Sequence, residues 1–181
     1  DNSDPEADPV LKNADLSFNG NFYRINRTDR EIGQFFQLVT TSASANEYIY
    51  VFSVDAENQV NIHWPRQADL NPKFSGLNES AMVTTAGSTI YIPGKTKGLK
   101  LAKKGTELLC ILFSTKKIGN IKAVSEYMAD NKENFSSALE SLLADYIVPK
   151  SDIQFVADHI EFSTESTQGF VVPIVLELEA R

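Results

Sequence analysis

The feature that most limits how this chain can fold is a hairpin-like stretch from Glu47 to Pro65, EYIYVFSVDAENQVNIHWP. Two strand-like runs, Tyr48 to Val54 and Gln59 to Trp64, flank the short polar loop Asp55-Ala56-Glu57-Asn58. The first run is apolar on both faces, which is typical of a strand inside a sheet. The second alternates as a half-buried strand does, until Pro65, which has no N–H for a ladder. We therefore expect the other segments to pack onto this hairpin or to extend its sheet.

Further strands are predicted on both sides of the hairpin, in runs rich in aromatic and β-branched residues. These runs are Phe22–Ile25, Gln34–Thr41, MVTT and STIYI within Ala81–Pro93, Thr106–Ser114, His159–Ser163 and Gly169–Glu179. Pro173 and two glutamates in the last run indicate an edge strand or a strand with one buried face.

A helical period replaces the strand pattern after Lys117. Ile121, Val124 and Met128 fit a short helix, and six apolar residues from Phe135 to Ile147 form an amphipathic stripe that ends before Pro149. The order of strands, helices and strands predicts a mainly β fold. We expect a β-sandwich or open barrel with antiparallel pairing and a helical insertion of one or two helices, at about residues 121–148, before the last strands.

Length and charge limit the domain count and the partner classes. Residues 1–21, which are acidic and contain two prolines, are predicted to be a flexible N-terminal arm or linker, and residues 22–181 a single β-rich domain. The net charge of -7 argues against nucleic acid as a partner, because phosphate binding favours a basic surface. Cys110, the single cysteine, lies in LLCILFS and is predicted to be a buried small hydrophobe. No apolar run reaches the roughly 20 residues of a membrane helix.

Motifs for catalysis and for cofactor or metal binding are missing from the sequence. His63 and His159 have no carboxylate, cysteine or histidine neighbours at ligand spacing, and no G-x-S-x-G elbow is present. Gly94-Lys95-Thr96 lacks the preceding spaced glycine of a phosphate-binding loop. We therefore predict no catalytic residue, no cofactor and no metal site.

Two surface features are candidates for partner binding. His63, Trp64 and Arg66 combine an aromatic anchor with an arginine, although the alternation of the strand directs Trp64 toward the core. A local lysine cluster is either a docking patch for an acidic partner or anionic polymer, or a guard of an exposed strand edge. It consists of Lys95, Lys97, Lys100, Lys103 and Lys104.

Short motifs from about Phe22 to Ile118 carry a family resemblance. They are YIYVFSVDAENQV followed by a Trp-Pro step, GSTIYIPG and KKGTELLCILFST; the matching positions are Asp55, Trp64-Pro65, Gly87…Ile92-Pro93 and Gly105-Thr106-Glu107. This pattern resembles a bacterial family of domains of unknown function that are appended to caspase-like peptidases and protein kinases and also occur in secreted proteins. The resemblance implies an accessory, non-catalytic β domain and slightly favours an extracytoplasmic location.

Three functional hypotheses are consistent with these sequence features. The preferred one is a non-enzymatic interaction or sensing module, accessory to a larger protein or at the cell envelope, with a protein partner or an upstream domain. The second is a hydrolase whose site is assembled from distant residues such as His63, His159 and carboxylates. The third is an envelope polysaccharide-binding domain, which requires a row of exposed aromatic side chains.

Overall fold

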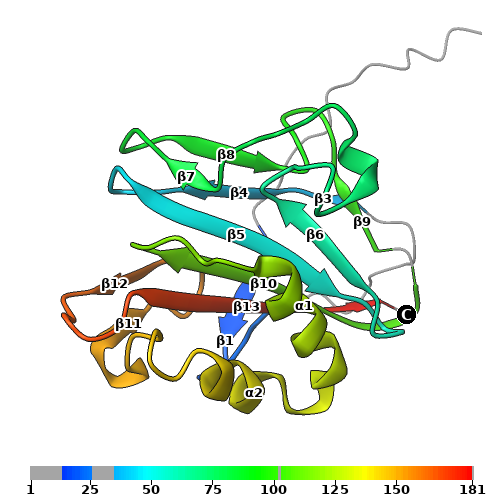
Figure 1. The fold of residues 1–181 in the computed structure, drawn as a ribbon. Coiled ribbons are helices and arrows are strands. Elements are labelled where there is room, and N and C mark those ends of the chain that lie inside the picture. Colours follow the sequence, from blue (N-terminus) through cyan, green and yellow to red (C-terminus); the bar gives the residue numbers. More distant parts are fainter. Residues whose placement is uncertain (1–13, 26–34, 102, 181) are drawn as a thin grey trace, which may run out of the picture.

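The computed structural model describes residues 14–25, 35–101 and 103–180. Its centre is a sheet in the order β1-β2-β13-β10-β5-β6, and β7 pairs with the start of β5 (Figure 1). The strands of this sheet are β1 (Leu16–Phe18), β2 (Tyr23–Ile25), β5 (Glu47–Val54), β6 (Val60–Trp64), β7 (Met82–Val83), β10 (Gly105–Ser114) and β13 (Val171–Ala180).

The central three strands, β5, β10 and β13, are buried on both faces. β10 pairs antiparallel with β13 along its whole length and with β5 from Leu108 to Ser114. Alternate residues of the three strands enter two separate hydrophobic cores. Ile49, Leu109 and Ile174 belong to the first core, whereas Phe52 and Cys110 belong to the second. The apolar runs IYVF, LLCILF and VVPIVL within these strands thus reflect cover on both sides.

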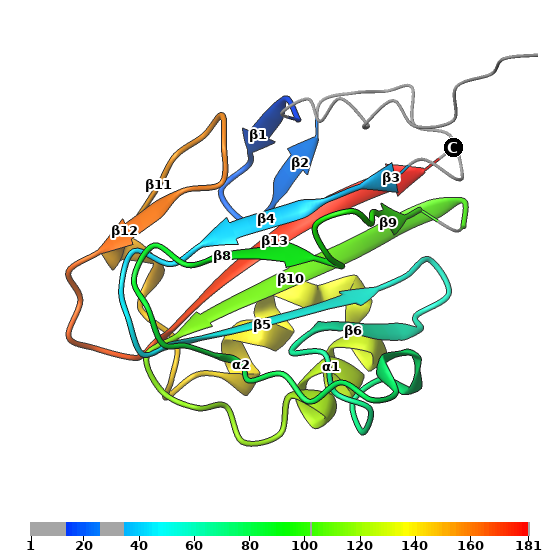
Figure 2. The same ribbon diagram turned by 90° about the horizontal axis from the view of Figure 1, so that it is seen from above.

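A layer of short strand pairs covers the first core, and two helices cover the second (Figures 1 and 2). The covering strands are β3 (Phe35–Phe36) paired with β9 (Leu99–Lys100), and β4 (Leu38–Thr41) paired with β8 (Thr89–Ile92). The helices are α1 (Ile121–Asp130) and α2 (Phe135–Leu142). The remaining elements are β11 (Ile153–Phe155), paired with β12 (Phe162–Thr164), and the 3-10 turns Pro72–Phe74, Lys132–Asn134 and Lys150–Asp152.

The predicted fold class is confirmed, with one difference in strand direction. The protein is mainly β, with its two α-helices inserted before the last strands. All pairs of the central sheet are antiparallel except β2 with β13, which run parallel at Leu176↔Tyr23 and Glu177↔Arg24. The sheet is therefore mixed, and it does not close into a barrel among the described residues.

The first described strand lies at an edge of this sheet, whereas the last strand lies inside it. Residues 1–13 of the predicted arm lie outside the described residues, and Leu16–Phe18 forms the edge strand β1. β13 was predicted to be an edge or one-sided strand, but it lies between β10 and β2. Cys110 is fully buried as predicted, and burial raises the pKa of its thiol. Within the described residues, no helix is long and apolar enough to cross a membrane.

The amphipathic stripe predicted a longer second helix than the structure contains. α2 ends at Leu142, and the backbone N–H groups of Tyr146 and Ile147 both donate to the carbonyl of Leu143. Ile147 then forms a parallel bridge to Val171 at the start of β13. The sheet edge therefore captures Tyr146 and Ile147, which the apolar period alone assigns to the helix.

Gly169 allows this capture, and its replacement is our first prediction. Its φ is +72°, and a Cβ there would lie 2.3 Å from the carbonyl oxygen of Ile147. We expect Gly169→Ala to lower the free energy of unfolding by at least about 3 kcal/mol, because backbone strain adds to a clash with fixed backbone. The measurement is urea unfolding followed by circular dichroism.

Gly87→Ala is the matched control for this experiment. Gly87 has a similar φ of +76°, but no atom of the described residues lies within 4 Å of the Cβ position. This variant should lose only the strain energy, about 1 kcal/mol. Equal losses in the two variants would contradict the close approach at Gly169.

Candidate functional site

The three residues predicted as a partner site lie at the end of β6, where Arg66 ties two parts of the chain together. Its guanidinium makes a two-pronged contact with Glu79, at 2.6 Å from Nε to Oε2 and 2.5 Å from Nη2 to Oε1. Its Nη1 donates to the carbonyl of Pro93 at 2.7 Å, just after β8. The guanidinium also lies 5.4 Å from the ring centroid of Trp64, whose half-buried indole packs against the first core. Arg66 thus holds the Pro93 turn in place.

His63 lies on a bulge of β6 and faces into the sheet. The pairing of β6 with β5 shifts between Val51↔Trp64 and Phe52↔Ile62, so His63 is the extra residue. Its Nε2 is 2.9 Å from the hydroxyl of Ser53, which is fully buried. Burial, with a smaller contribution from the charge of Lys73, lowers the pKa of His63 from 6.5 to about 4. The imidazole is therefore neutral near pH 7.

Ser53 joins His63 to a carboxyl group that sequence reasoning did not single out. Burial raises the pKa of Glu107, and the charge of Asp55 adds to this, while a hydrogen bond from Ser53 and the charge of Lys132 oppose it. The order is imidazole, hydroxyl, carboxyl, across the adjacent strands β6, β5 and β10. In a nucleophilic triad the imidazole stands between hydroxyl and carboxylate and the hydroxyl reaches substrate. Here the hydroxyl is central and inaccessible, so the three groups form a buried polar link.

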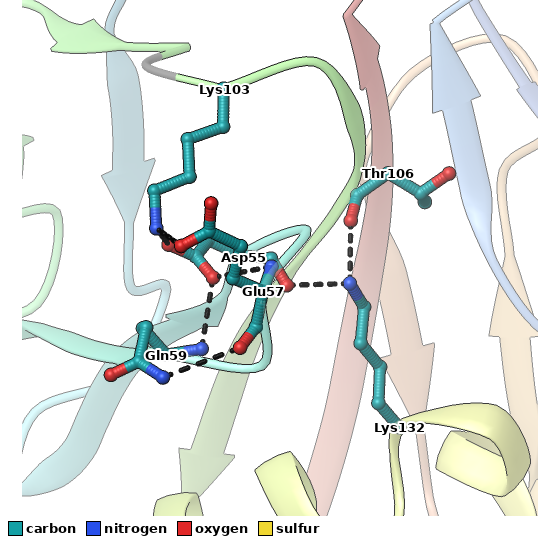
Figure 3. Close-up of polar contacts among 6 residues, drawn as sticks. All are labelled: Asp55, Glu57, Gln59, Lys103, Thr106 and Lys132. Carbon is teal, nitrogen blue, oxygen red and sulfur yellow. Dashed lines mark hydrogen bonds and ion pairs between the residues drawn. The ribbon is translucent and has the colours of Figure 1, made fainter.

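The turn between β5 and β6 carries the second polar cluster (Figure 3). Lys103 contacts Asp55 Oδ2 at 2.9 Å and Glu57 Oε2 at 2.5 Å. Burial by itself would raise the pKa of Asp55, but hydrogen bonds from Lys103 and from the N–H groups of Gln59 and Glu57 outweigh it. The pKa of Asp55 is therefore below its usual value, and the carboxylate stays charged.

Lys132 connects the turn between the helices to the same cluster. Its Nζ donates at 2.6 Å to the carbonyl of Asp55 and at 2.6 Å to the carbonyl of Thr106 (Figure 3). Burial lowers its pKa, against the opposing effect of Asp55, Glu107 and Glu133. Two charge-assisted bonds to backbone carbonyls make Lys132 a cross-link between the helical layer and the ends of β5 and β10.

The outward side of the short-strand layer, which we call the outer face, carries exposed apolar side chains next to lysines. It consists of Phe35, Val39, Tyr91, Lys95 and Lys100. Phe35 is 69% exposed and Val39 48% exposed, which is unusual for large apolar side chains on strands. Phe35 pairs with Lys100 and Val39 with Tyr91 across the strands. The ammonium groups of Lys100 and Lys95 lie 6.0 Å and 5.7 Å from the ring centroids of Phe35 and Tyr91.

The turn from Gly94 to Gly98, at the rim of the outer face, is held from within. Gln37 Nε2 lies 2.6 Å from the carbonyl of Gly94 and 3.1 Å from that of Lys95. Arg66 holds the preceding carbonyl, that of Pro93. Arg66, which the sequence predicts as a partner-binding residue, therefore supports the turn from Gly94 to Gly98. It is not itself one of the residues of the outer face. The lysine cluster itself divides, because Lys103 belongs to the Asp55 cluster.

His159 lies far from His63. It follows β11, beside Asp158 and Glu161, with 57% of its side chain exposed. This segment contacts β2 through the hydroxyl of Tyr23, which donates to the carbonyl of Val156, whereas β6 is at the other edge of the sheet. Hydrogen bonds that His159 donates to the carboxylates of Glu161 and Asp158 raise its pKa. The two histidines do not share a site, and among the described residues no three His, Cys, Asp or Glu side chains are grouped to hold a metal ion.

Comparisons with protein families, with curated proteins and with solved structures found no match to this chain. The family resemblance drawn from the sequence motifs therefore stays a prediction. The motif residues themselves have structural partners. The carbonyl of Pro93 accepts from Arg66, and a Cβ on Gly105 would lie 2.9 Å from the Cβ of Ala56 in the Asp55 turn.

The cross-link made by Lys132 gives our second prediction. We expect Lys132→Met to lower the free energy of unfolding by about 1.5–3 kcal/mol, since two partly buried carbonyls lose a charged donor. Lys122→Met, in the exposed part of α1, is the matched control and should change stability by no more than about 0.5 kcal/mol. Similar losses in both variants, measured by urea unfolding, would show that the contacts of Lys132 are of no consequence.

The third prediction concerns pH. The folded-state pKa of His63, about 4, is below the unfolded value of 6.5, so the unfolded chain binds more protons between these values. Stability should therefore fall as the pH is lowered from 6.5 to 4. The contribution of His63 should be about 1–3 kcal/mol, discounted because the ring retains some contact with water.

Variants of the two histidines isolate this effect. In His63→Gln the acid-induced loss measured by thermal or urea unfolding should shrink by the stated amount. His159→Gln should keep the loss, because the pKa of His159 is raised and its stabilisation is lost on going to higher pH. If both variants lose the same stability as the parent protein when the pH falls from 6.5 to 4, burial of His63 is not the source of that loss.

Proposed function

We propose that this protein is a non-catalytic interaction module whose outer face docks an acidic segment of a partner protein. The observation that carries the proposal is the 69% exposure of Phe35 beside Lys100 in a chain of net charge -7. The module acts as an accessory to a larger protein or at the cell envelope.

The composition of the outer face suits an acidic partner with apolar side chains. Phe35 and Val39 offer exposed apolar surface, and Lys95 and Lys100 carry positive charge above the aromatic rings. Aromatic anchors supply much of the binding energy of protein interfaces, and opposite charge steers the encounter. A positive patch attracts acidic surfaces, whereas the rest of this acidic protein repels them. The patch therefore selects the docking orientation.

Protection of a strand edge accounts for only part of this surface. Lysines on an exposed edge discourage pairing with another sheet, and Lys100 in the two-residue strand β9 fits that purpose. Edge protection does not require an exposed Phe35 or Val39, and exposed apolar side chains work against it. The combination supports docking.

The hydrolase hypothesis has less support. It requires distant residues to converge, but His63 and His159 belong to segments at opposite edges of the sheet. Ser53, the hydroxyl next to His63, is fully buried. These observations favour a non-enzymatic role.

The polysaccharide hypothesis requires exposed aromatic residues in a row. Among the described residues, the large exposed aromatic side chains are Phe35 on the outer layer, Tyr127 on α1 and Tyr146 after α2. The outer layer and the helices lie on opposite faces of the central sheet (Figure 1). Trp64 is half-buried beneath Arg66. Protein docking on the outer face is therefore preferred.

Charge reversal on the outer face gives our fourth prediction. The probe is a fluorescent synthetic peptide of alternating Glu and Leu, and the measurement is fluorescence anisotropy at low and high salt. Lys95→Glu with Lys100→Glu should weaken binding about tenfold or more at low salt, because attraction becomes repulsion. Phe35→Ser should weaken binding at both salt concentrations, since it removes apolar contact.

The control is Lys117→Glu with Lys122→Glu, which changes the net charge by the same amount at exposed positions outside the outer face. It should leave binding within about twofold at physiological salt, where charges more than about 8 Å from the bound peptide are largely screened, and at low salt it should weaken binding less than the outer-face double variant does. If both double variants weaken the peptide equally, only net charge is at work and docking on the outer face is wrong.

A further inference from the structure

A cavity of about 420 Å³ lies between α2, β13, β11 and the β1–β2 hairpin, and none of its lining residues belongs to the outer face. Its volume is within the roughly 300–1,000 Å³ of small-molecule sites. It is also nearly three times the roughly 150 Å³ of an apolar cavity known to hold benzene. Most of the described lining residues are apolar or aromatic, among them Phe18, Tyr23, Leu139 and Ile153. The cavity is therefore large enough for a ring with a polar head group.

The cavity exists because the outer edge of β13 is covered at two places and open between them. At its start, Val171 donates to the carbonyl of Tyr146 and accepts from the N–H of Val148. Further along, the ladder to β2 covers only Leu176 and Glu177. Pro173, Ile174 and Val175, between these contacts, line the cavity. The gap is thus built into the topology.

The same geometry disfavours an added strand as the occupant. A peptide extending the sheet at β13 needs a continuous open edge. Here residues 146–148 close one end and β2 closes the other. Pro173 points its backbone to the same side as Val171, and it has no N–H to donate. A compact molecule suits this gap better than a chain.

The rim of the cavity carries one charge of each sign among the described lining residues. Lys150 is the first residue of the 3-10 turn that precedes β11. Its Nζ lies 2.5 Å from Asn21 Oδ1. Glu140, on α2, lines the cavity from another element, one helical turn from Ser136. A ligand with a single charge would meet attraction from one of these groups and repulsion from the other. A head group with both charges satisfies both.

From this arrangement we infer that the cavity binds a small zwitterion with an apolar body, of the chemical class of the apolar α-amino acids. The apolar part enters between Leu139 and Ile153, the carboxylate reaches Lys150, and the ammonium group reaches Glu140. This site is independent of the outer face and does not require the docking proposed above.

Three probes with the same phenyl body test the inference on the full chain. They are L-phenylalanine, 3-phenylpropanoate, which lacks the ammonium group, and 2-phenylethylamine, which lacks the carboxylate. Binding is measured by isothermal titration calorimetry and by NMR chemical-shift changes. We expect phenylalanine to bind at least about tenfold tighter than either analogue, since each charged contact is worth about that factor.

Variants at the rim assign the two charges. Lys150→Met should weaken phenylalanine about tenfold or more and should not weaken 2-phenylethylamine, which loses only a repulsion. Glu140→Gln should weaken phenylalanine to the level of 3-phenylpropanoate. Ala144→Trp, at an exposed position of the lining, fills the cavity and should abolish binding of all three probes. Lys122→Met, outside the cavity, should change nothing.

Two results would overturn the inference. One is equal affinity for phenylalanine and 3-phenylpropanoate, which would remove any role for Glu140 and leave a monocarboxylate site. The other is no binding of any probe at millimolar concentration by a protein whose unfolding transition is cooperative. Because the outer face takes no part in this experiment, neither result bears on the docking of an acidic partner.

Discussion

Burial of β5, β10 and β13 on both faces is the constraint on which the other parts of the structure depend. Three adjacent strands with apolar side chains on both sides cannot leave either side in water, since each exposed large apolar side chain costs about 1.5–3 kcal/mol. One side is covered by α1 and α2, and the other by the short strands and the β11–β12 pair. The outer face lies on the outward side of one covering layer, and the cavity lies where α2 and β11 meet the outer edge of β13.

Polar groups occur where this apolar sheet ends, and their partners explain their presence. Ser53 and Glu107 lie at the ends of the buried runs of β5 and β10, and His63 completes a link across three strands. Lys132 satisfies two carbonyls at the same end, with Asp55 paired to Lys103. Buried polar groups are stable only when bonded, so this cluster serves the fold.

The proposed docking surface and the cavity have different physical origins. The outer face results from the alternation of side chains along β3 and β4. Phe35 and Val39 point outward, whereas their neighbours Phe36 and Leu38 pack in the first core. The cavity results from topology, because two separate segments cover one edge of β13 incompletely. Among the matching positions of the family-like motifs, Pro93 and Gly105 serve turns and lie in neither site.

The sequence by itself determined the strand and helix classes, because side-chain periodicity reports burial on one or both faces of each element. It predicted the interior strands at Tyr48–Val54 and Thr106–Ser114, the helical insertion, and the burial of Cys110. Only the tertiary structure decided the parallel pairing of β2 with β13, the capture of Ile147 at the sheet edge, and the approach of Ser53 and Glu107 to His63. The physical reason is range. Periodicity reflects the environment of neighbouring residues, whereas these contacts join segments that are far apart in the chain, and their positions depend on how strands are ordered and covered.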